Sequence, residues 1–499
     1  MLETLKSMIL TSLNSDSRMI GGQRCRRGRY GVTLAGLVVL ATLASGAEPD
    51  LARRPPDAVP TVVESGSWTQ TVALLQLPDD DGLREAVRLA RNLNTNMPVG
   101  EARARLDQWI ASKAAPLAQL SHLIQADQIE VPATMWLDND YVDTLGHFIA
   151  AARLKIIVAR GHAERGAHAE AAREFGAIFT LGRQIAAARG PIVANLIAMA
   201  IPPMALNGMR WLASQEGVPE EVLEDMLRHL PAPGTGDPDL VQTYRTELAL
   251  AMVPQLRKIE ALAASPTNPF PFSISRVLDV SHTLATAAAF FRRCERNALG
   301  TWPDRDRKIS DDANRLVTLA PGECPDEMIQ KIMWNTFLGQ DPTEAKRWRR
   351  LQRFGLMPLL TLSPKSEERD AARQWLYMER HRKKQPNLLG NSLVASTMSL
   401  EPQLLRISVE RRTDVSLTRA YLALLLVQSR TGSWPAALSD PGVTALLGQP
   451  PVDLFSMQPL RYSREKGMLW SVGRDEQDDG GDAKERRDIV IRLPDLHMP

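Results

Sequence analysis

Apolar residues recur with helical spacing through most of the chain. From residue 81 onward, Leu83, Val87 and Ala90 fall three or four positions apart, which places them on one face of a helix. The acidic run 79–81 precedes this pattern, and negative charge is favourable at the N-terminal end of a helix dipole. Similar patterns return up to about residue 380. They predict a body built from helices.

The clearest helical pair covers residues 141–190. Its first half is strongly apolar, residues 164–168 read as a turn, and its second half is again apolar at helical spacing. Gly166 before a helix carrying Ala171 and Phe175 resembles one tetratricopeptide hairpin, which implies two antiparallel helices. The period of about 34 residues that such repeats share does not recur along the chain.

The next segment, 191–213, is an apolar helix that we expect to be bent or broken at Pro202 and Pro203. Its uninterrupted apolar part is shorter than the ~20 residues that cross a bilayer comfortably. We therefore predict that this segment belongs to the hydrophobic core.

The N-terminal region has the pattern of an export signal. A basic run at 24–29 precedes an uncharged segment, 30–47, which ends in small residues and leads into a polar stretch rich in proline. We predict an exported, periplasmic or envelope protein, whose residues 30–47 are either cleaved or form a tether to the inner membrane. A buried helix of a cytosolic domain is the alternative, and Met19 is an alternative start.

The length and net charge of the chain limit the number of domains and the kinds of partner that we expect. A chain of 499 residues is long for one domain, and 60 basic against 58 acidic residues give no reason to expect a nucleic-acid partner. Proline and glycine mark several loops. The expected divisions are an N-terminal extension with its signal or anchor, a linker, two helical regions and a C-terminal module: 1–47, 48–67, 68–230, 231–410 and 411–499.

The pattern changes in the C-terminal module. A strong helix over 415–430 is followed by two short apolar segments, 459–464 and 467–473, that read as strands joined by a tight turn. Residues 488–493 alternate as a third strand would. The predicted fold is therefore mainly α, with a multi-helix body and a small C-terminal module of a helix and an antiparallel sheet.

Acidic residues and two glycines follow the second predicted strand. Calcium takes six or more oxygen ligands, and Asp475, Gln477 and Asp479 are spaced like the first half of an EF-hand loop. The twelfth position of that loop should be a glutamate, but Arg486 stands there and the flanks are strands, which excludes an EF-hand. An acidic turn that binds no metal is the alternative.

About 85 C-terminal residues resemble the globular module of the major pseudopilins of type II secretion systems. Three motifs occur in the family's order: GSWP at 432–435, VDLFSMQPLRYS at 452–463 and LWSVGRDEQDDGGDAKERRDI at 469–489. Leu454 stands where the family has proline, and Gly36 stands where its N-terminal segment has an acidic residue. The resemblance implies a link to secretion or pilus machinery.

The same resemblance implies a different calcium loop, built from aspartate side chains and backbone carbonyls. Carried over residue by residue, it points to Asp475 and to the closing Asp488. Asp479 and Asp482, like Asp478, are secondary candidates. Calcium is accordingly the one cofactor we expect.

Export would also permit a disulfide. Cys294 and Cys324 are the two cysteines beyond the N-terminal segment, and an oxidising compartment makes a bridge between them plausible. Two buried free thiols are the alternative.

Local catalytic motifs are missing from the sequence. It contains no nucleophile elbow, zinc-protease helix, phosphate-binding loop or dinucleotide-binding glycine motif, and it suggests no small-molecule substrate. We predict a non-enzymatic envelope protein that acts as a scaffold for protein partners. The alternative is an exported hydrolase whose site is assembled from dispersed residues.

Overall fold

The computed structural model describes most of the chain between residues 81 and 494. The ranges are 81–90, 96–125, 141–232, 239–264, 278–316, 361–365, 387–398, 400–482 and 488–494, with residues 369, 372, 373 and 376. The predicted signal or tether at 30–47, the linker at 48–67 and Cys324 lie outside these residues.

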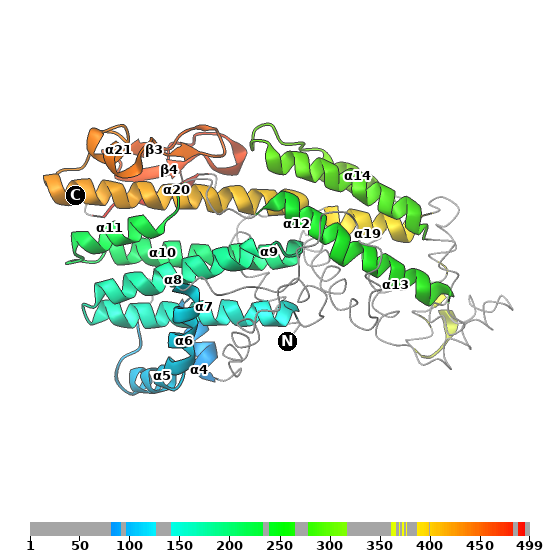
Figure 1. Ribbon diagram of the computed structural model, residues 1–499, viewed down its shortest axis with the longest axis horizontal. Helices are drawn as coiled ribbons and strands as arrows, with labels where there is room; N and C mark the ends of the chain where they lie inside the picture. Colours follow the sequence, from blue (N-terminus) through cyan, green and yellow to red (C-terminus); the bar gives the residue numbers. More distant parts are fainter. Residues whose placement is uncertain are drawn as a thin grey trace.

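The fold is mainly helical with a small C-terminal sheet, which confirms the predicted class (Figure 1). The first helices are α4 (Asp81–Ala90), α5 (Gly100–Ser112), α6 (Ala114–Gln125), α7 (Tyr141–Glu164), α8 (His168–Ala187), α9 (Ile192–Ala200), α10 (Pro202–Ala213) and α11 (Glu220–His229). The later ones are α12 (Leu240–Thr246), α13 (Val253–Ala264), α14 (Val280–Leu299), α15 (Ile309–Arg315), α19 (Leu388–Met398), α20 (Glu401–Thr431) and α21 (Pro441–Leu447). A π-helical segment, Glu247–Met252, joins α12 to α13.

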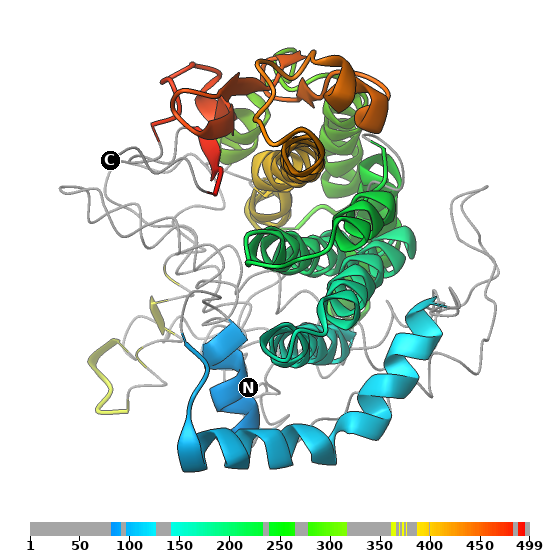
Figure 2. The ribbon, with the colours of Figure 1, turned by 90° about the vertical axis from the view of Figure 1, so that its left-hand side faces the viewer.

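Helices α7, α8, α10, α11 and α20 form a stack. Helix α8 packs against α7 on one side and α10 on the other, and α20 packs against both α10 and α11. Seen end-on, α5 and α6 lie beyond the α7 end of the stack, and the C-terminal strands lie beyond its α20 end (Figure 2). The predicted α7–α8 hairpin is confirmed, and Gly166 makes its turn with a positive φ of 73°, which glycine adopts without strain.

The contact between α8 and α10 depends on glycines. A Cβ atom at Gly208 would lie only 2.1 Å from the ring of Phe175, and one at Gly182 would lie 2.6 Å from the ring of Pro202. The two helices therefore approach more closely than any larger residue at these positions would allow. Phe175 is fully buried in the space that Gly208 leaves.

The predicted break in the apolar segment is confirmed, since α9 ends at Ala200 and α10 begins at Pro202. Together they form the one described stretch, Ile192–Ala213, that has the length and composition to cross a membrane. Its apolar side chains lie in the hydrophobic core, among them Ile197, Leu206 and Met209. The expectation that it is a core segment is confirmed.

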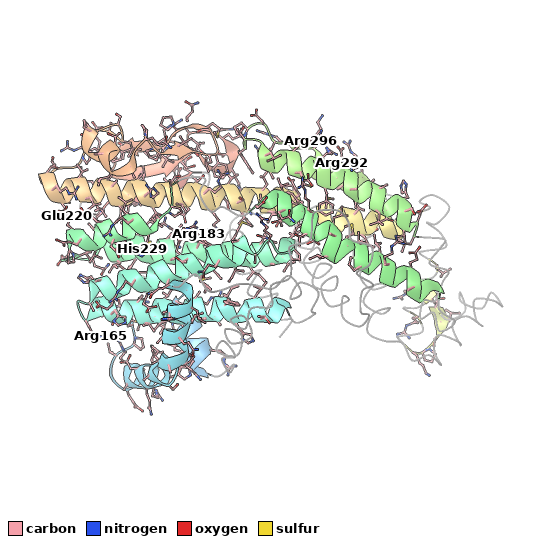
Figure 3. The ribbon with its side chains drawn as sticks, in the orientation of Figure 1. Arg165, Arg183, Glu220, His229, Arg292 and Arg296 are labelled. Carbon is pink, nitrogen blue, oxygen red and sulfur yellow. The ribbon has the colours of Figure 1, made fainter. Side chains whose placement is uncertain are left out.

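Helix α20 links the stack to the C-terminal module. It contacts α9, α10 and α11 of the stack and also α21, β1, β4 and β5 of the module. A single hydrophobic cluster extends from Leu120 to Leu493. Near the C-terminal end of α20, Arg430 pairs with Glu220 and Glu224 of α11. Figure 3 labels Glu220 at this position. The boundary expected between residues 410 and 411 falls inside α20.

The C-terminal strands form two small sheets. In the first, β3 (Arg461–Ser463), β4 (Met468–Ser471) and β5 (Ile489–Arg492) are antiparallel in that order. These are the three strands that the sequence predicts. A second, two-stranded sheet pairs β1 (Val452–Asp453) with β2 (Gln458–Pro459).

Candidate functional site: the acidic loop and the polar network behind it

The acidic loop follows β4 and returns to the sheet at β5. Asp488, just before β5, is only 4% exposed, and its Oδ2 accepts a hydrogen bond of 2.8 Å from the Gly481 amide. Among the described residues, its Oδ1 has no hydrogen-bond partner. Burial raises the pKa of Asp488, while the backbone amides of Gly481 and Asp479 oppose the rise and the carboxylates of Asp478 and Asp479 add to it.

Asp475, the other leading candidate for a calcium ligand, lies in a more exposed environment than Asp488. It ends a short 3-10 turn, Gly473–Asp475, is exposed, and accepts a hydrogen bond of 3.3 Å from the amide of Gln477 through Oδ1. This local bond stabilises the turn. Of the secondary candidates, Asp482 is exposed and Asp479 is partly buried.

Asp478 holds the loop against the sheet. Its Oδ1 accepts hydrogen bonds of 3.0 Å from the Trp470 indole and from the Gly480 amide, and its Oδ2 accepts one of 3.0 Å from Arg461. Burial works against ionisation, but these hydrogen bonds hold the pKa of Asp478 below its usual value. The carboxylate thus stabilises the loop structurally.

A second aspartate, which sequence reasoning did not single out, organises the start of the loop. Asp453 in β1 is fully buried; its Oδ1 accepts from the Ser471 hydroxyl (2.8 Å) and the Phe455 amide (3.0 Å), and its Oδ2 accepts from the Val472 amide (2.9 Å). Its position in the VDLF motif is the feature of the sequence that could have pointed to it. It fixes the end of β4, where the loop begins.

No three carboxylate, histidine or cysteine side chains gather to hold a metal within the described part of the chain. Asp488, whose buried Oδ1 makes no hydrogen bond to the described residues, has the chemistry of a ligand for a hard cation. Residues 483–487, in the same loop, lie outside the description.

Glu476 attaches the acidic loop to the helical body. Its Oε1 accepts hydrogen bonds of 2.7 Å from both Arg305 and Arg307, and its Oε2 accepts one of 2.9 Å from Arg307. The Arg305 guanidinium also lies 3.7 Å from the Trp302 ring centroid. Trp302 in turn makes an edge-to-face contact with Phe455 at 5.2 Å. We refer to Trp302, Arg305, Arg307 and Glu476 as the latch.

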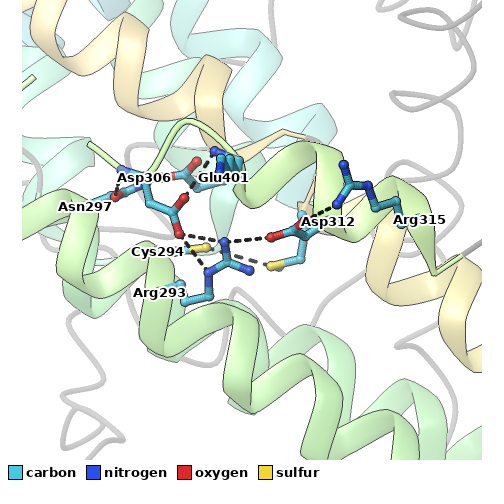
Figure 4. Close-up of polar contacts among 9 residues, drawn as sticks. Arg293, Cys294, Asn297, Asp306, Asp312, Arg315 and Glu401 are labelled. Carbon is cyan, nitrogen blue, oxygen red and sulfur yellow. Dashed lines mark hydrogen bonds and ion pairs between the residues drawn. The ribbon is translucent and has the colours of Figure 1, made fainter. Parts of the chain in front are cut away.

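A polar network, buried at Asn297 and Glu401, continues from the latch to the start of α20 (Figure 4). The Asp306 amide donates to Asn297 Oδ1 (2.7 Å), and Asn297 Nδ2 donates to Glu401 Oε1 (3.0 Å). Arg293 binds Asp306 at 2.6 Å and Asp312 at 3.1 Å. Burial raises the pKa of Glu401, which is 1% exposed, to about 7.

Charge near the end of α14 stabilises the ionised form of Asp306. Burial opposes ionisation, but the hydrogen bonds from Arg293 outweigh it, and Arg296 adds an attractive charge, so the pKa of Asp306 is lowered. Figure 3 shows Arg292 and Arg296 on the end of α14 that faces the C-terminal strands. Both side chains are exposed.

Cys294 and Tyr244 lie beside the network. The Cys294 sulfur is fully buried, 3.8 Å from the sulfur of Met398, and burial raises the pKa of the thiol. Burial also raises the pKa of Tyr244, helped by the charge of Glu401. A protonated, buried thiol is a poor nucleophile. Whether Cys294 pairs with Cys324 stays a prediction.

Comparison of the chain with protein-family models, with curated proteins and with solved structures gave no match.

Proposed function

We propose that this protein is an exported or membrane-anchored, non-enzymatic protein of the cell envelope. It acts as a scaffold for protein partners, in the setting of secretion or pilus machinery. The C-terminal module, which resembles a pseudopilin domain, is the part that meets this machinery, and the helical stack supports it.

The joining of module and stack is the observation that supports the proposal most directly. The two share α20, and the latch adds a second attachment where Glu476 binds Arg305 and Arg307. A module held at two places keeps a fixed orientation. Such an orientation suits a protein that positions its partners.

Calcium at the acidic loop forms the second part of the proposal. Asp488 supports it because its buried Oδ1 makes no hydrogen bond to the described residues, and such an oxygen is costly unless a ligand satisfies it. A bound calcium ion would supply positive charge there. Asp475, Asp479 and Asp482 remain candidates for further ligands.

Cell fractionation tests the location. We expect the full chain in the membrane or periplasmic fraction of a Gram-negative host, and a variant without residues 30–47 in the cytoplasm. Finding the full chain in the cytoplasm with an intact N-terminus would overturn the proposal.

Photo-crosslinking tests the scaffold. A photoreactive residue at the exposed Gln477, in the acidic loop, should form a discrete adduct with a component of the secretion or pilus machinery. Val99, 85% exposed and at the other end of the stack, serves as the control position. Identical adducts at both positions, or none at Gln477, would contradict this function.

Hydrogen exchange of the full chain tests calcium. We expect millimolar calcium to slow exchange in residues 473–482 and 488–494, and magnesium to do so much less. Asp488→Asn should abolish the calcium effect, whereas Glu465→Gln, an exposed change in the β3–β4 turn, should keep it. An equal effect of calcium on wild type and Asp488→Asn would exclude a site at this residue.

A further inference from the structure

We propose that Glu401 works as a proton-operated switch on the latch. When Glu401 is protonated, the loop 300–308 stays packed against the start of α20 and keeps its contact with Glu476. When Glu401 loses its proton, the loop is released and this contact is weakened. This inference does not depend on the proposed function.

The first argument is the unbroken chain of contacts. Glu401 binds the Asn297 side-chain amide, and the same amide group accepts from the Asp306 backbone. Asp306 follows Arg305 directly, and Arg305 holds Glu476. A change at Glu401 therefore reaches the acidic loop through one side chain of α14 and one short loop.

The second argument is the charge around Glu401. Helix α14 contributes Arg293 and Cys294 as well as Asn297, α12 contributes Tyr244, and the loop contributes Arg305 and Asp306. Both arginines already bind other carboxylates, Arg293 those of Asp306 and Asp312 and Arg305 that of Glu476. Their charges and the hydrogen bond from Asn297 favour the ionised form of Glu401, Asp306 opposes it, and burial outweighs the favourable contributions.

The third argument is burial. Because Glu401 is only 1% exposed, its ionised form cannot be hydrated while the loop is closed. An ionised, buried carboxylate is costly, and its free energy falls if water reaches it. The loop is a short connection between α14 and α15, so its movement admits water with less disturbance than a displacement of either helix.

The direction of the effect follows from linkage. Burial raises the pKa of Glu401 from 4.5 to about 7, so the closed latch holds a proton that the open latch gives up. The closed form is therefore favoured below this range and weakened as pH rises through about 7. Between pH 5.5 and 8 the opening equilibrium should increase roughly tenfold or more.

Hydrogen exchange of the full chain, followed by mass spectrometry in the presence of EDTA, tests the switch. After correction for the intrinsic pH dependence of exchange, protection of 300–308 and of 473–478 should fall roughly tenfold or more from pH 5.5 to 8. Glu401→Gln, which stays neutral, should remove this fall. Persistence of the fall in Glu401→Gln would overturn the proposal.

Glu247→Gln is the matched control. Glu247 is another buried carboxyl with a pKa raised by burial to about 7, but it accepts its hydrogen bond from the Ile192 amide at the start of α9. This variant should keep the pH response of 300–308. If Glu247→Gln abolishes that response as well, the effect is a general loss of stability and the switch is wrong.

Glu476→Gln provides a test that does not require Glu401→Gln to fold. Residues 473–478 should lose protection at both pH values, because the contact with Arg305 and Arg307 is weakened. Residues 300–308 should still respond to pH, since Glu401 is unchanged. Loss of the response at 300–308 in this variant would show that the sensor is not Glu401.

Discussion

Arg305 binds Glu476 at 2.7 Å while lying against the indole ring of Trp302, although 171 positions separate the two charged residues. Their side chains are 15% and 22% exposed, so the ion pair is largely shielded from water. Partly buried ion pairs with several hydrogen bonds contribute more to stability than surface pairs do. This ion pair should therefore stabilise the attachment of the C-terminal module to the helical body.

Loss of the Glu476 charge should destabilise the protein measurably. We expect Glu476→Gln to lower the free energy of unfolding by about 2 kcal/mol, because it leaves Arg305 shielded without a carboxylate. Urea unfolding of the full chain measures this change. Glu465→Gln, which removes an exposed carboxylate from the β3–β4 turn, should change it by less than about 0.5 kcal/mol. Equal effects of the two changes would refute a stabilising role for the latch.

The latch also shows where sequence reasoning reaches its limit. The acidic run predicts either a calcium loop or a turn that binds no metal, and neither interpretation gives a role to Glu476. Its partners, Arg305 and Arg307, follow α14, and nothing local relates them to residue 476. Charge complementarity between distant segments has no sequence period, so only the fold could reveal this contact.

Local patterns were far more informative about the secondary structure. The α7–α8 hairpin, the break before Pro202 and the three strands of the C-terminal sheet all follow from apolar spacing, glycine and proline. The extent of α20 did not follow. Its N-terminal half contains Glu401, Arg411 and Arg412. Because these residues are charged, the sequence does not show that this half of the helix is packed against neighbouring helices.

The close contact of α8 with α10 predicts an unusual response to alanine. Alanine is normally better than glycine in a helix by about 1 kcal/mol. At Gly208 we expect the opposite, a loss of about 1–3 kcal/mol, because the new Cβ would lie 2.1 Å from the Phe175 ring. Thermal unfolding should show a lower Tm for Gly208→Ala.

Gly146→Ala is the control for that prediction. Gly146 also lies within a helix, α7, but a Cβ there would meet no other packing atom of the described residues within 4 Å. This variant should be neutral or more stable than wild type. If both variants raise Tm, helix propensity dominates and the close approach is not important for stability.

Glu247 and Glu401 predict how overall stability depends on pH. Burial raises both pKa values from 4.5 to about 7, so the folded state binds more protons than the unfolded state between these values. Stability should therefore decrease as pH rises from about 4.5 to above 7, by on the order of 3 kcal/mol for each group. Urea unfolding between pH 5 and 8.5 measures this, and Glu247→Gln should reduce the slope. A slope unchanged in that variant would contradict the assignment of Glu247.

The predicted disulfide can be tested by its chemistry in the folded and unfolded chain. Cys294 is fully buried with a raised thiol pKa, so alkylation of the native protein would be slow whether or not a bridge exists. Labelling therefore has to be done in denaturant without reductant, followed by peptide mass analysis. If the protein is exported, we expect Cys294 and Cys324 to remain unlabelled until a reductant is added. Labelling of both without reductant would identify them as free thiols, and Cys294 would then stabilise α14 only by packing its sulfur against Met398.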